Sequence, residues 1–260
     1  MEITEENGVR TVTFDRPEVM NAFTTDTAEE LADVIADTDA DEFDALVLTG
    51  EGGAFSAGGD IESMAEREET TEQAYERVTE TFGRVVEEAL SAKVPIVAKV
   101  NGDAVGAGLA VAAVSDFAYA VESATFSCAF VRAGLIPDTG GSFLLPHLVG
   151  LRAAKRLAFT GEFFGADEAA ELGLINEAVP DDELDERVAD LLDTLRERPT
   201  TTIGLAKRAI HENLGRGWQE AADYENHVQS LAYDTPEHEE GVAAFLEGRD
   251  PEIGRASCRE

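Results

Sequence analysis

The feature that most constrains the fold is an alternation, through the first half of the chain, of short β-rich runs and segments with apolar residues at helical spacing. One helical stripe is formed by Leu31, Val34 and Ile35, and another includes Val78 and Phe82. Strands that alternate with amphipathic helices are typical of an α/β core. The sequence therefore predicts an α/β fold with strands over 9–16, 45–50, 95–102 and 117–121.

The second half of the chain is predicted to be mostly helical. The last helix has start and stop signals, because Thr235 and Pro236 stand at its beginning and Gly248 and Pro251 lie beyond its end. Helices gathered at a carboxyl terminus often pack on a neighbouring subunit, so we expect an oligomer. The predicted helices cover 139–149, 151–159, 166–172, 184–197, 200–213, 217–233 and 236–247.

The charge balance indicates the setting in which such a chain is stable. It has 54 Asp and Glu against 20 Lys and Arg, a net charge of −34 that is spread along the sequence. Self-repulsion of this size destabilises a compact state unless salt screens it, and the Debye length falls to about 3 Å at 1 M salt. We therefore predict a halophilic origin, with an acidic mesophilic protein as the alternative. We expect no nucleic-acid partner, since no segment supplies a basic face.

The sequence also predicts a cytoplasmic location and no metal centre. Its start, "MEITEENGVR", lacks a signal region, and no apolar run approaches membrane-spanning length, so we expect no membrane partner. Cys128 and Cys258 give neither a disulfide framework nor a metal cluster, and Cys128 is predicted to fill the core. The histidines, which show no metal-ligand spacing, are His147, His211, His227 and His238.

Two glycine-rich stretches are candidates for binding. In "GGAFSAGGDIESM" (52–64), small residues let backbone approach a ligand, and Gly59 can offer a bare N–H, although a tight strand-to-helix connection explains the pattern equally well. In "KVNGDAVGAGLAVAAVSD" (99–116), Gly106, Ala107 and Gly108 open an apolar helix whose first N–H groups suit a developing oxyanion. The stretch only partly matches a dinucleotide fingerprint, because Val111 stands where the third glycine belongs, so a nicotinamide enzyme is disfavoured.

A third stretch, "RAGLIPDTGGS" (132–142), raises the question of what Asp138 does. It stands where an N-cap of the helix predicted over 139–149 is preferred. A carboxylate beside an apolar segment also suits proton transfer. Both roles stay open on the sequence, and they do not exclude one another.

Five separated motifs resemble those of the enoyl-CoA hydratase/isomerase (crotonase) family. They are "DRPEVMNAF", "AFSAGGDI", "VNGDAVGAGLAVAAVSDF", "GLIPDTGGSFLLPHLVG" and "LAFTGEFFGADEAAELGLINEAV", and the resemblance covers residues 3 to 252. It implies a spiral of ββα units with a C-terminal helical trimerisation region, assembled as a homotrimer or a dimer of trimers. It also implies an acyl-CoA thioester as substrate, without a cofactor.

The resemblance assigns roles to particular residues. The backbone N–H groups of Gly59 and Ala107 are expected to form the oxyanion hole for the thioester carbonyl. Phe245, on the last helix, is expected to lie over a ligand of a neighbouring subunit. The remaining residues expected to bind the substrate or its CoA portion are Arg16, Ala22, Phe55, Ala57, Gly58, Asp60, Ile61, Gly106 and Phe130.

The chain departs from the family's hydratases at two positions. Where those enzymes carry two glutamates that handle water and its proton, this chain has Ala110 and Phe130. Asp138 is then the candidate acid/base, and its surroundings resemble the epoxyphenylacetyl-CoA isomerase branch. We therefore expect an isomerase that moves a double bond or opens an epoxide through a thioester enolate. The alternatives are an enoyl-CoA hydratase of fatty-acid β-oxidation and a non-catalytic acyl-CoA-binding protein, while an RNA-binding role is disfavoured by the charge.

We divide the chain into three parts. A spiral core with the acyl-CoA site is expected over 1–195, and a C-terminal helical extension over 196–252. The closing letters "GRASCRE" break from the acidic pattern, so 253–260 are predicted to be a vector-derived tail.

Overall fold

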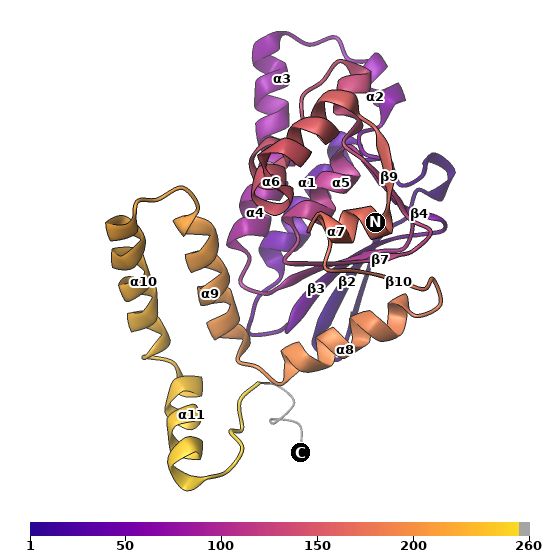
Figure 1. Ribbon diagram of the computed structural model, residues 1–260. Helices are drawn as coiled ribbons and strands as arrows, with labels where there is room; N and C mark the ends of the chain where they lie inside the picture. The colour runs from indigo at the N-terminus through magenta and orange to yellow at the C-terminus, as the bar shows by residue number, and fades with distance from the viewer. Residues whose placement is uncertain (255–260) are drawn as a thin grey trace.

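Two β-sheets, one of six strands and one of four, form the centre of the molecule, and helices surround them (Figure 1). The computed structural model describes residues 1–254, so the tail predicted over 253–260 lies, from 255 on, outside the described residues. The larger sheet has the order β1-β2-β3-β5-β7-β10, with β1 antiparallel and the other strands parallel. Its strands are β1 (Glu2–Glu6), β2 (Val9–Phe14), β3 (Ala45–Gly50), β5 (Ile96–Val100), β7 (Phe117–Val121) and β10 (Glu177–Val179).

The predicted α/β core is thus confirmed. The strands expected over 45–50 and 117–121 occur at those residues, and the other two are shorter than expected. β3 and β5 have almost every residue buried, because parallel strands are covered on both faces.

The smaller sheet has the order β4-β6-β8-β9, and its first three strands are parallel neighbours. Along the chain each of these strands follows a strand of the larger sheet and leads into a helical segment. The strands that follow one another in this way are β3 and β4, β5 and β6, and β7 and β8, so the chain repeats a strand–strand–helix unit. The elements are β4 (Ala54–Ser56), β6 (Asp103–Val105), β8 (Thr125–Ser127), β9 (Phe163–Gly165), α2 (Ile61–Ala65) and the 3-10 segment η3 (Ala129–Ala133).

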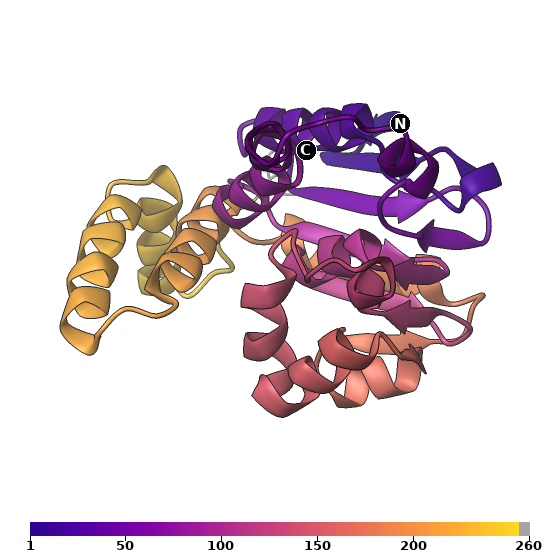
Figure 2. The ribbon, with the colours of Figure 1, turned by 90° about the horizontal axis from the view of Figure 1, so that it is seen from above.

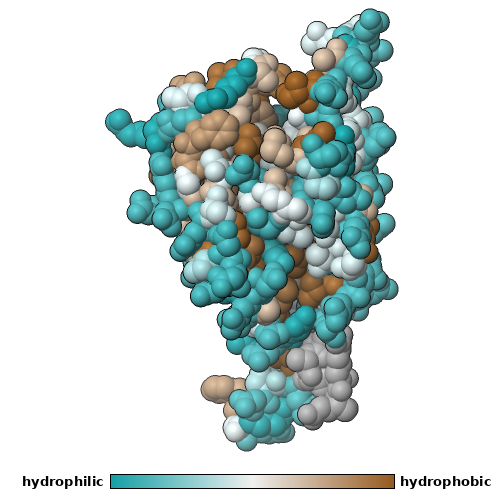
Figure 3. Space-filling view, turned by 90° about the vertical axis from the view of Figure 1, so that its right-hand side faces the viewer, coloured by the Kyte–Doolittle hydropathy of each residue, from teal (hydrophilic) through white to brown (hydrophobic). Residues whose placement is uncertain are grey.

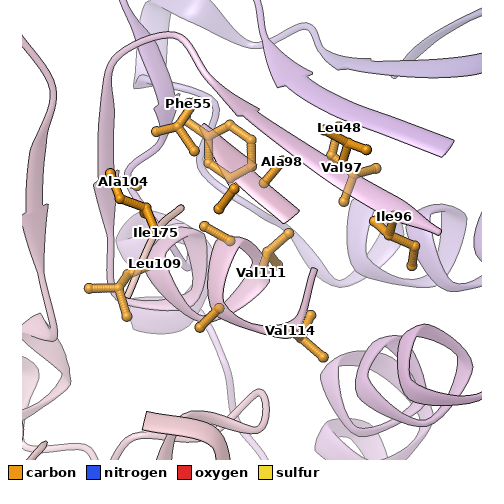
Figure 4. Close-up of a cluster of buried hydrophobic side chains, with 14 of the residues drawn as sticks. Leu48, Phe55, Ile96, Val97, Ala98, Ala104, Leu109, Val111, Val114 and Ile175 are labelled. Atoms are coloured by element: carbon orange, nitrogen blue, oxygen red, sulfur yellow. The ribbon is translucent and has the colours of Figure 1, made fainter. Parts of the chain in front are cut away.

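The helix α5 (Ala107–Val114) is buried along its whole length. Its side chains Leu109 and Val111 lie among Phe55 of β4 and Ile96 of β5 in the apolar cluster of Figure 4. A helix that is apolar on all sides belongs in the core. The packing therefore fixes the position of the helix's first N–H groups.

Helix α6 (Gly141–Thr160) differs in detail from the expectation. The predicted break between 149 and 151 is confirmed, since Gly150 has a non-helical φ of 76° and kinks the helix. The helix begins at Gly141 rather than at 139, because the two preceding residues have positive φ. The other helices of the core are the 3-10 turn η1 (Pro17–Val19), α1 (Thr25–Asp37), α3 (Thr71–Val78), the π-helical η2 (Thr79–Gly83), α4 (Arg84–Ser91), α7 (Ala166–Glu171) and α8 (Leu184–Arg196).

Three C-terminal helices form an arm that projects from the body (Figures 1 and 2). The arm is anchored by a partly buried ion pair of 2.6 Å between Lys207 on its first helix and Asp116, which follows α5. Asp116 also accepts a hydrogen bond of 2.7 Å from the N–H of Ile96. Farther out the arm exposes apolar side chains, including Trp218 and Phe245. Its helices are α9 (Thr200–Asn213), α10 (Trp218–Ala232) and α11 (Pro236–Glu247), close to the bounds expected from the sequence.

The surface shown in Figure 3 is mostly hydrophilic, with apolar patches at the height of α2 and α6 and others lower down, at the height of the larger sheet. Exposed apolar residues near these elements include Ile61, Leu135 and Ile136. Over residues 1–254, no helix combines the length and apolar character needed to cross a membrane.

Candidate active site

Three loops that follow β4, β6 and β8 meet at one edge of the smaller sheet. Because these strands are parallel, with Ser56 opposite Ala104, their carboxyl ends lie side by side. The N–H of Gly106 donates to the Ser127 carbonyl at 2.9 Å, which joins the second loop to the third strand. Ligands of α/β proteins bind beyond the carboxyl ends of strands. The candidate site is therefore built from 57–60, 106–107 and 128–130.

The first two loops approach so closely that only glycine fits between them. A Cβ on Gly58 would lie 2.6 Å from the Val105 carbonyl oxygen and 3.0 Å from the Ala107 nitrogen. Gly58 also has a φ of +90°, a conformation that other residues rarely adopt. A Cβ on Gly108 would lie 2.3 Å from the carbonyl oxygen of Ser56. The structure therefore brings the predicted oxyanion residues Gly59 and Ala107 together.

The local backbone directs both N–H groups away from protein acceptors. The Phe23 N–H donates to the Gly58 carbonyl at 2.7 Å, and the Asp60 N–H donates to the Phe23 carbonyl at 2.9 Å. Because neighbouring residues of an extended chain point their N–H groups to opposite sides, the N–H of Gly59 points away from Phe23. Ala107 is the first residue of α5, where an N–H has no partner within the helix. Within residues 1–254, neither N–H has a backbone acceptor. Such a pair suits a developing oxyanion.

Polar side chains hold the first loop in place. Arg16 donates to the Ala22 carbonyl at 2.6 Å and to Asp60 Oδ2 at 2.8 Å. Asp60 caps α2 by accepting from the Ser63 N–H at 2.9 Å. This backbone hydrogen bond and the Arg16 guanidinium hold the pKa of Asp60 below its usual value. Buried Asn21 donates to the carbonyls of 51 and 54, which fixes the chain beside the loop.

The other residues expected to bind substrate lie in different settings. The side chain of Phe55 is fully buried, with its ring 5.4 Å from that of Phe14, so only its backbone can face a ligand. Ala57 donates its N–H to the Met20 carbonyl at 2.8 Å. Ile61 is 63% exposed at the start of α2. Phe245 is 85% exposed on α11, a helix of the arm that lies apart from β4 and α5 in Figure 1. A ligand of the same subunit is therefore not its partner.

Asp138 does not cap the following helix. The N-cap of α6 is Gly140, and no side chain accepts a hydrogen bond there, so the predicted capping role is wrong. Instead, the Asp138 carboxylate accepts a hydrogen bond of 3.0 Å from the Thr139 hydroxyl. Burial raises the pKa of Asp138, while the Thr139 hydroxyl and the guanidinium of Arg77 act in the opposite direction. A carboxylate with a raised pKa suits proton transfer near neutral pH.

Arg77 is a neighbour of Asp138 that the sequence alone does not reveal. It comes from α3 and is held by two hydrogen bonds to Glu69, at 2.9 and 2.6 Å. Its charge and that of Asp138 stabilise one another. Arg67 lies against the same cluster, and its burial and the charge of Arg77 lower its pKa. A lone arginine in an acidic helical segment carries no pattern that marks it as part of a site.

The two positions that carry glutamate in hydratases of the family are apolar and buried here. Ala110 is fully buried in α5, and Phe130 is 8% exposed in η3. Neither side chain can take up or release a proton. Among the described residues, no group of three or more His, Cys, Asp or Glu is arranged to hold a metal ion.

Comparison with known proteins defines the class to which this fold and site belong. Residues 4–255 match the family described as Enoyl-CoA hydratase/isomerase. The chain is 36% identical over 250 residues to a protein named "Probable enoyl-CoA hydratase" from Rhodobacter capsulatus, covering 96% of this chain and 95% of that one. It is 35% identical over 252 residues to the 1,2-epoxyphenylacetyl-CoA isomerase of Escherichia coli, covering 95% of each. The crystal structure of an enoyl-CoA hydratase from Mycobacterium smegmatis aligns with a TM-score of 0.89 at 29% identity, covering 96% of this chain and 97% of that one.

The chain therefore belongs to the enoyl-CoA hydratase/isomerase family. The crotonase-type fold expected from the motifs is confirmed, including its C-terminal helical region. An enzyme that acts on acyl-CoA thioesters is consistent with this membership. The similar proteins include a probable hydratase and an isomerase, so family membership is compatible with either reaction.

Proposed function

We propose that the protein is an acyl-CoA isomerase that moves a double bond or opens an epoxide through a thioester enolate. The observation that carries this proposal is the combination of one partly buried carboxylate, Asp138, with apolar residues at the two hydratase glutamate positions. Hydration needs groups that activate water, and Ala110 and Phe130 cannot do so. A shift of a double bond needs one base that takes a proton and returns it. The similarity to an epoxyphenylacetyl-CoA isomerase supports the same choice.

The proposed reaction is written for a 3-enoyl thioester. The Asp138 carboxylate removes a proton from C2, and the electron pair of that C–H bond moves into the thioester carbonyl to give a dienolate. The N–H groups of Gly59 and Ala107 stabilise the negative oxygen. Protonated Asp138 then delivers its proton to C4, and the charge returns from oxygen to form the 2-enoyl product. Proton and electrons balance within the substrate, so the scheme needs no cofactor.

The remaining roles in this proposal follow the predicted site residues. The CoA portion lies against the loop held by Arg16, Ala22 and Asp60, with backbone contacts from Phe55, Ala57, Gly58, Ile61 and Gly106. Phe130 forms an apolar wall near Asp138. A homotrimer or a dimer of trimers would place Phe245 of the exposed arm over a neighbour's ligand. The cytoplasmic location and the halophilic origin stay predictions.

Turnover of two substrates tests the proposal. The protein is incubated with a 3-enoyl-CoA and, separately, with crotonyl-CoA in concentrated KCl, and products are followed by mass. We expect double-bond migration without gain of water. We expect Asp138→Ala to lower its rate by about 10²–10⁴-fold, because it removes the acid/base group. Asp167→Ala, an exposed aspartate on α7, is the matched control and should keep the rate.

The two alternatives give different results in the same assay. Rapid hydration of crotonyl-CoA that survives Asp138→Ala would establish an enoyl-CoA hydratase and refute the role of Asp138. Tight binding of acyl-CoA with no turnover of any enoyl or epoxide thioester would establish a non-catalytic binding protein.

A further inference from the structure

The residue after Asp138 occupies a strained turn. The Gly141 N–H donates to the Asp138 carbonyl at 2.7 Å, and the two residues between them have positive φ, 51° for Thr139 and 75° for Gly140. Positive φ at both central positions defines a type I′ turn, in which Asn, Asp and Gly are preferred. Threonine is β-branched, so this conformation is unfavourable for it. Strain of this kind persists where the surrounding structure enforces it, and it concentrates at functional sites.

The strained conformation brings the Thr139 hydroxyl to the Asp138 carboxylate. The residue is only 4% exposed, and its Oγ1 donates to Oδ1 of Asp138 at 3.0 Å. The turn is also packed from outside, because the side chain of Val86 on α4 lies 3.3 Å from where a Cβ on Gly140 would be. The carboxylate is therefore held on one side by a hydroxyl that cannot easily turn away.

We propose that Thr139 is a positioning residue that orients the Asp138 carboxylate and keeps it ionised for proton transfer. We assign the exchange of protons to Oδ2, because Oδ1 is held by the hydroxyl. This inference rests on the proposed isomerase function, since it names the group on which the base of that reaction depends.

The charged groups around the carboxylate set the direction of the expected effect. Arg77 faces Asp138 from α3, and Glu69 binds Arg77, with Arg67 beside them. Arg77 and the Thr139 hydroxyl both favour the ionised form of Asp138, whereas burial favours the protonated form. Loss of the hydroxyl therefore raises the pKa of Asp138. Asp138 then stays protonated, and unable to act as a base, up to a higher pH than in the wild type.

The test uses Thr139→Val, which keeps the β-branched shape and removes only the hydroxyl. At pH 7 we expect kcat for 3-enoyl-CoA isomerisation to fall about tenfold or more, as for loss of a hydrogen bond to a charged group. The acidic limb of the kcat profile should move to higher pH, with little change in KM. Thr139→Ser should restore both the rate and the profile. Thr4→Val, on the exposed strand β1, is the matched control and should change neither.

Three results would overturn the inference. Thr139→Val with the wild-type rate and pH profile would show that the hydrogen bond is dispensable. If Thr139→Val lowers the rate equally at every pH, and Thr139→Ser does not restore it, Thr139 has a packing role instead. If the Asp138→Asn variant isomerises 3-enoyl-CoA at the wild-type rate, the proposed function itself is refuted, and Thr139 then has no base to position. Measurement of Asp138→Asn alongside thus distinguishes failure of the function from failure of the inference.

Discussion

Replacement of Gly108 by alanine separates two effects of opposite sign. Within a helix, alanine is favoured over glycine by about 1 kcal/mol, so propensity alone predicts a more stable protein. At this position the new Cβ would lie 2.3 Å from the Ser56 carbonyl oxygen and 2.9 Å from its Cβ. Contact distances below 3.4 Å are tight, so the two backbones must separate by about 1 Å. Overpacking of this kind costs about 1–3 kcal/mol, and we therefore expect a net loss of stability.

The same displacement reaches the proposed oxyanion site, because Ala107 directly precedes Gly108. Loss of one oxyanion donor lowers kcat by about 10²–10³-fold, and we expect Gly108→Ala to approach that range. Stability is measured by urea unfolding and kcat with 3-enoyl-CoA. Gly241→Ala on α11 is the control, and it should be slightly more stable and equally active. Among residues 1–254, no atom beyond its chain neighbours and the backbone of its own helix lies within 4 Å of the added Cβ. A Gly108→Ala variant that is stabilised like the control and fully active would refute the reasoning.

Three further predictions concern charge. Asp138→Asn should raise the unfolding midpoint at pH 7, because burial raises the pKa of Asp138 and its ionisation therefore opposes folding. This gain should vanish below the ordinary aspartate pKa of about 3.9, where Asp138 is protonated in both the folded and the unfolded protein. Asp60→Ala should lower the free energy of unfolding by about 1 kcal/mol at pH 7, because it removes the cap of α2 and the partner of Arg16. The pKa of Asp60 is lowered in the folded state, so this loss should shrink as the pH falls below about 3.9. Urea unfolding at several pH values measures both effects. The unfolding midpoint should rise steadily with KCl, because salt screens a net charge of −34, and no dependence on salt would contradict the halophilic prediction.

Four strands of the larger sheet and the helices of the arm could be predicted because their residues carry strong patterns, whereas β1 and β10 could not. Buried parallel strands appear as continuous apolar runs, and β3 and β7 were located to the residue. On the arm, Thr235 caps α11 by accepting from the His238 N–H, and Gly248 ends the helix with positive φ, as the start and stop signals indicate. Such signals act locally, so a single sequence contains them.

The smaller sheet and the surroundings of Asp138 could not be predicted from residue patterns. Strands of three residues, such as β4, β6 and β8, are too short to show a period of two. The position of Asp138 predicts a helix cap, because threonine at 139 gives no sign of the positive φ that tertiary packing imposes there. The ion pair of Arg77 with Glu69 and its approach to Asp138 depend on where α3 lies relative to the turn before α6. Contacts between distant segments of this kind leave no trace at either residue alone.

The carboxylate of Asp116 has a mechanical consequence for the molecule. It accepts a hydrogen bond from the Ile96 N–H in β5, lies two residues after the end of α5, and binds Lys207 of the projecting helix α9. One side chain thus connects the base of the arm to the segments that precede and follow α5. Helix α9 is also joined to the body by hydrogen bonds between Thr200 and Asp44 and between His211 and the Leu90 carbonyl. A force applied to α10 or α11 by a docking partner would therefore be shared among these contacts, and the Asp116 carboxylate is the one that would pass it to the segments on either side of α5.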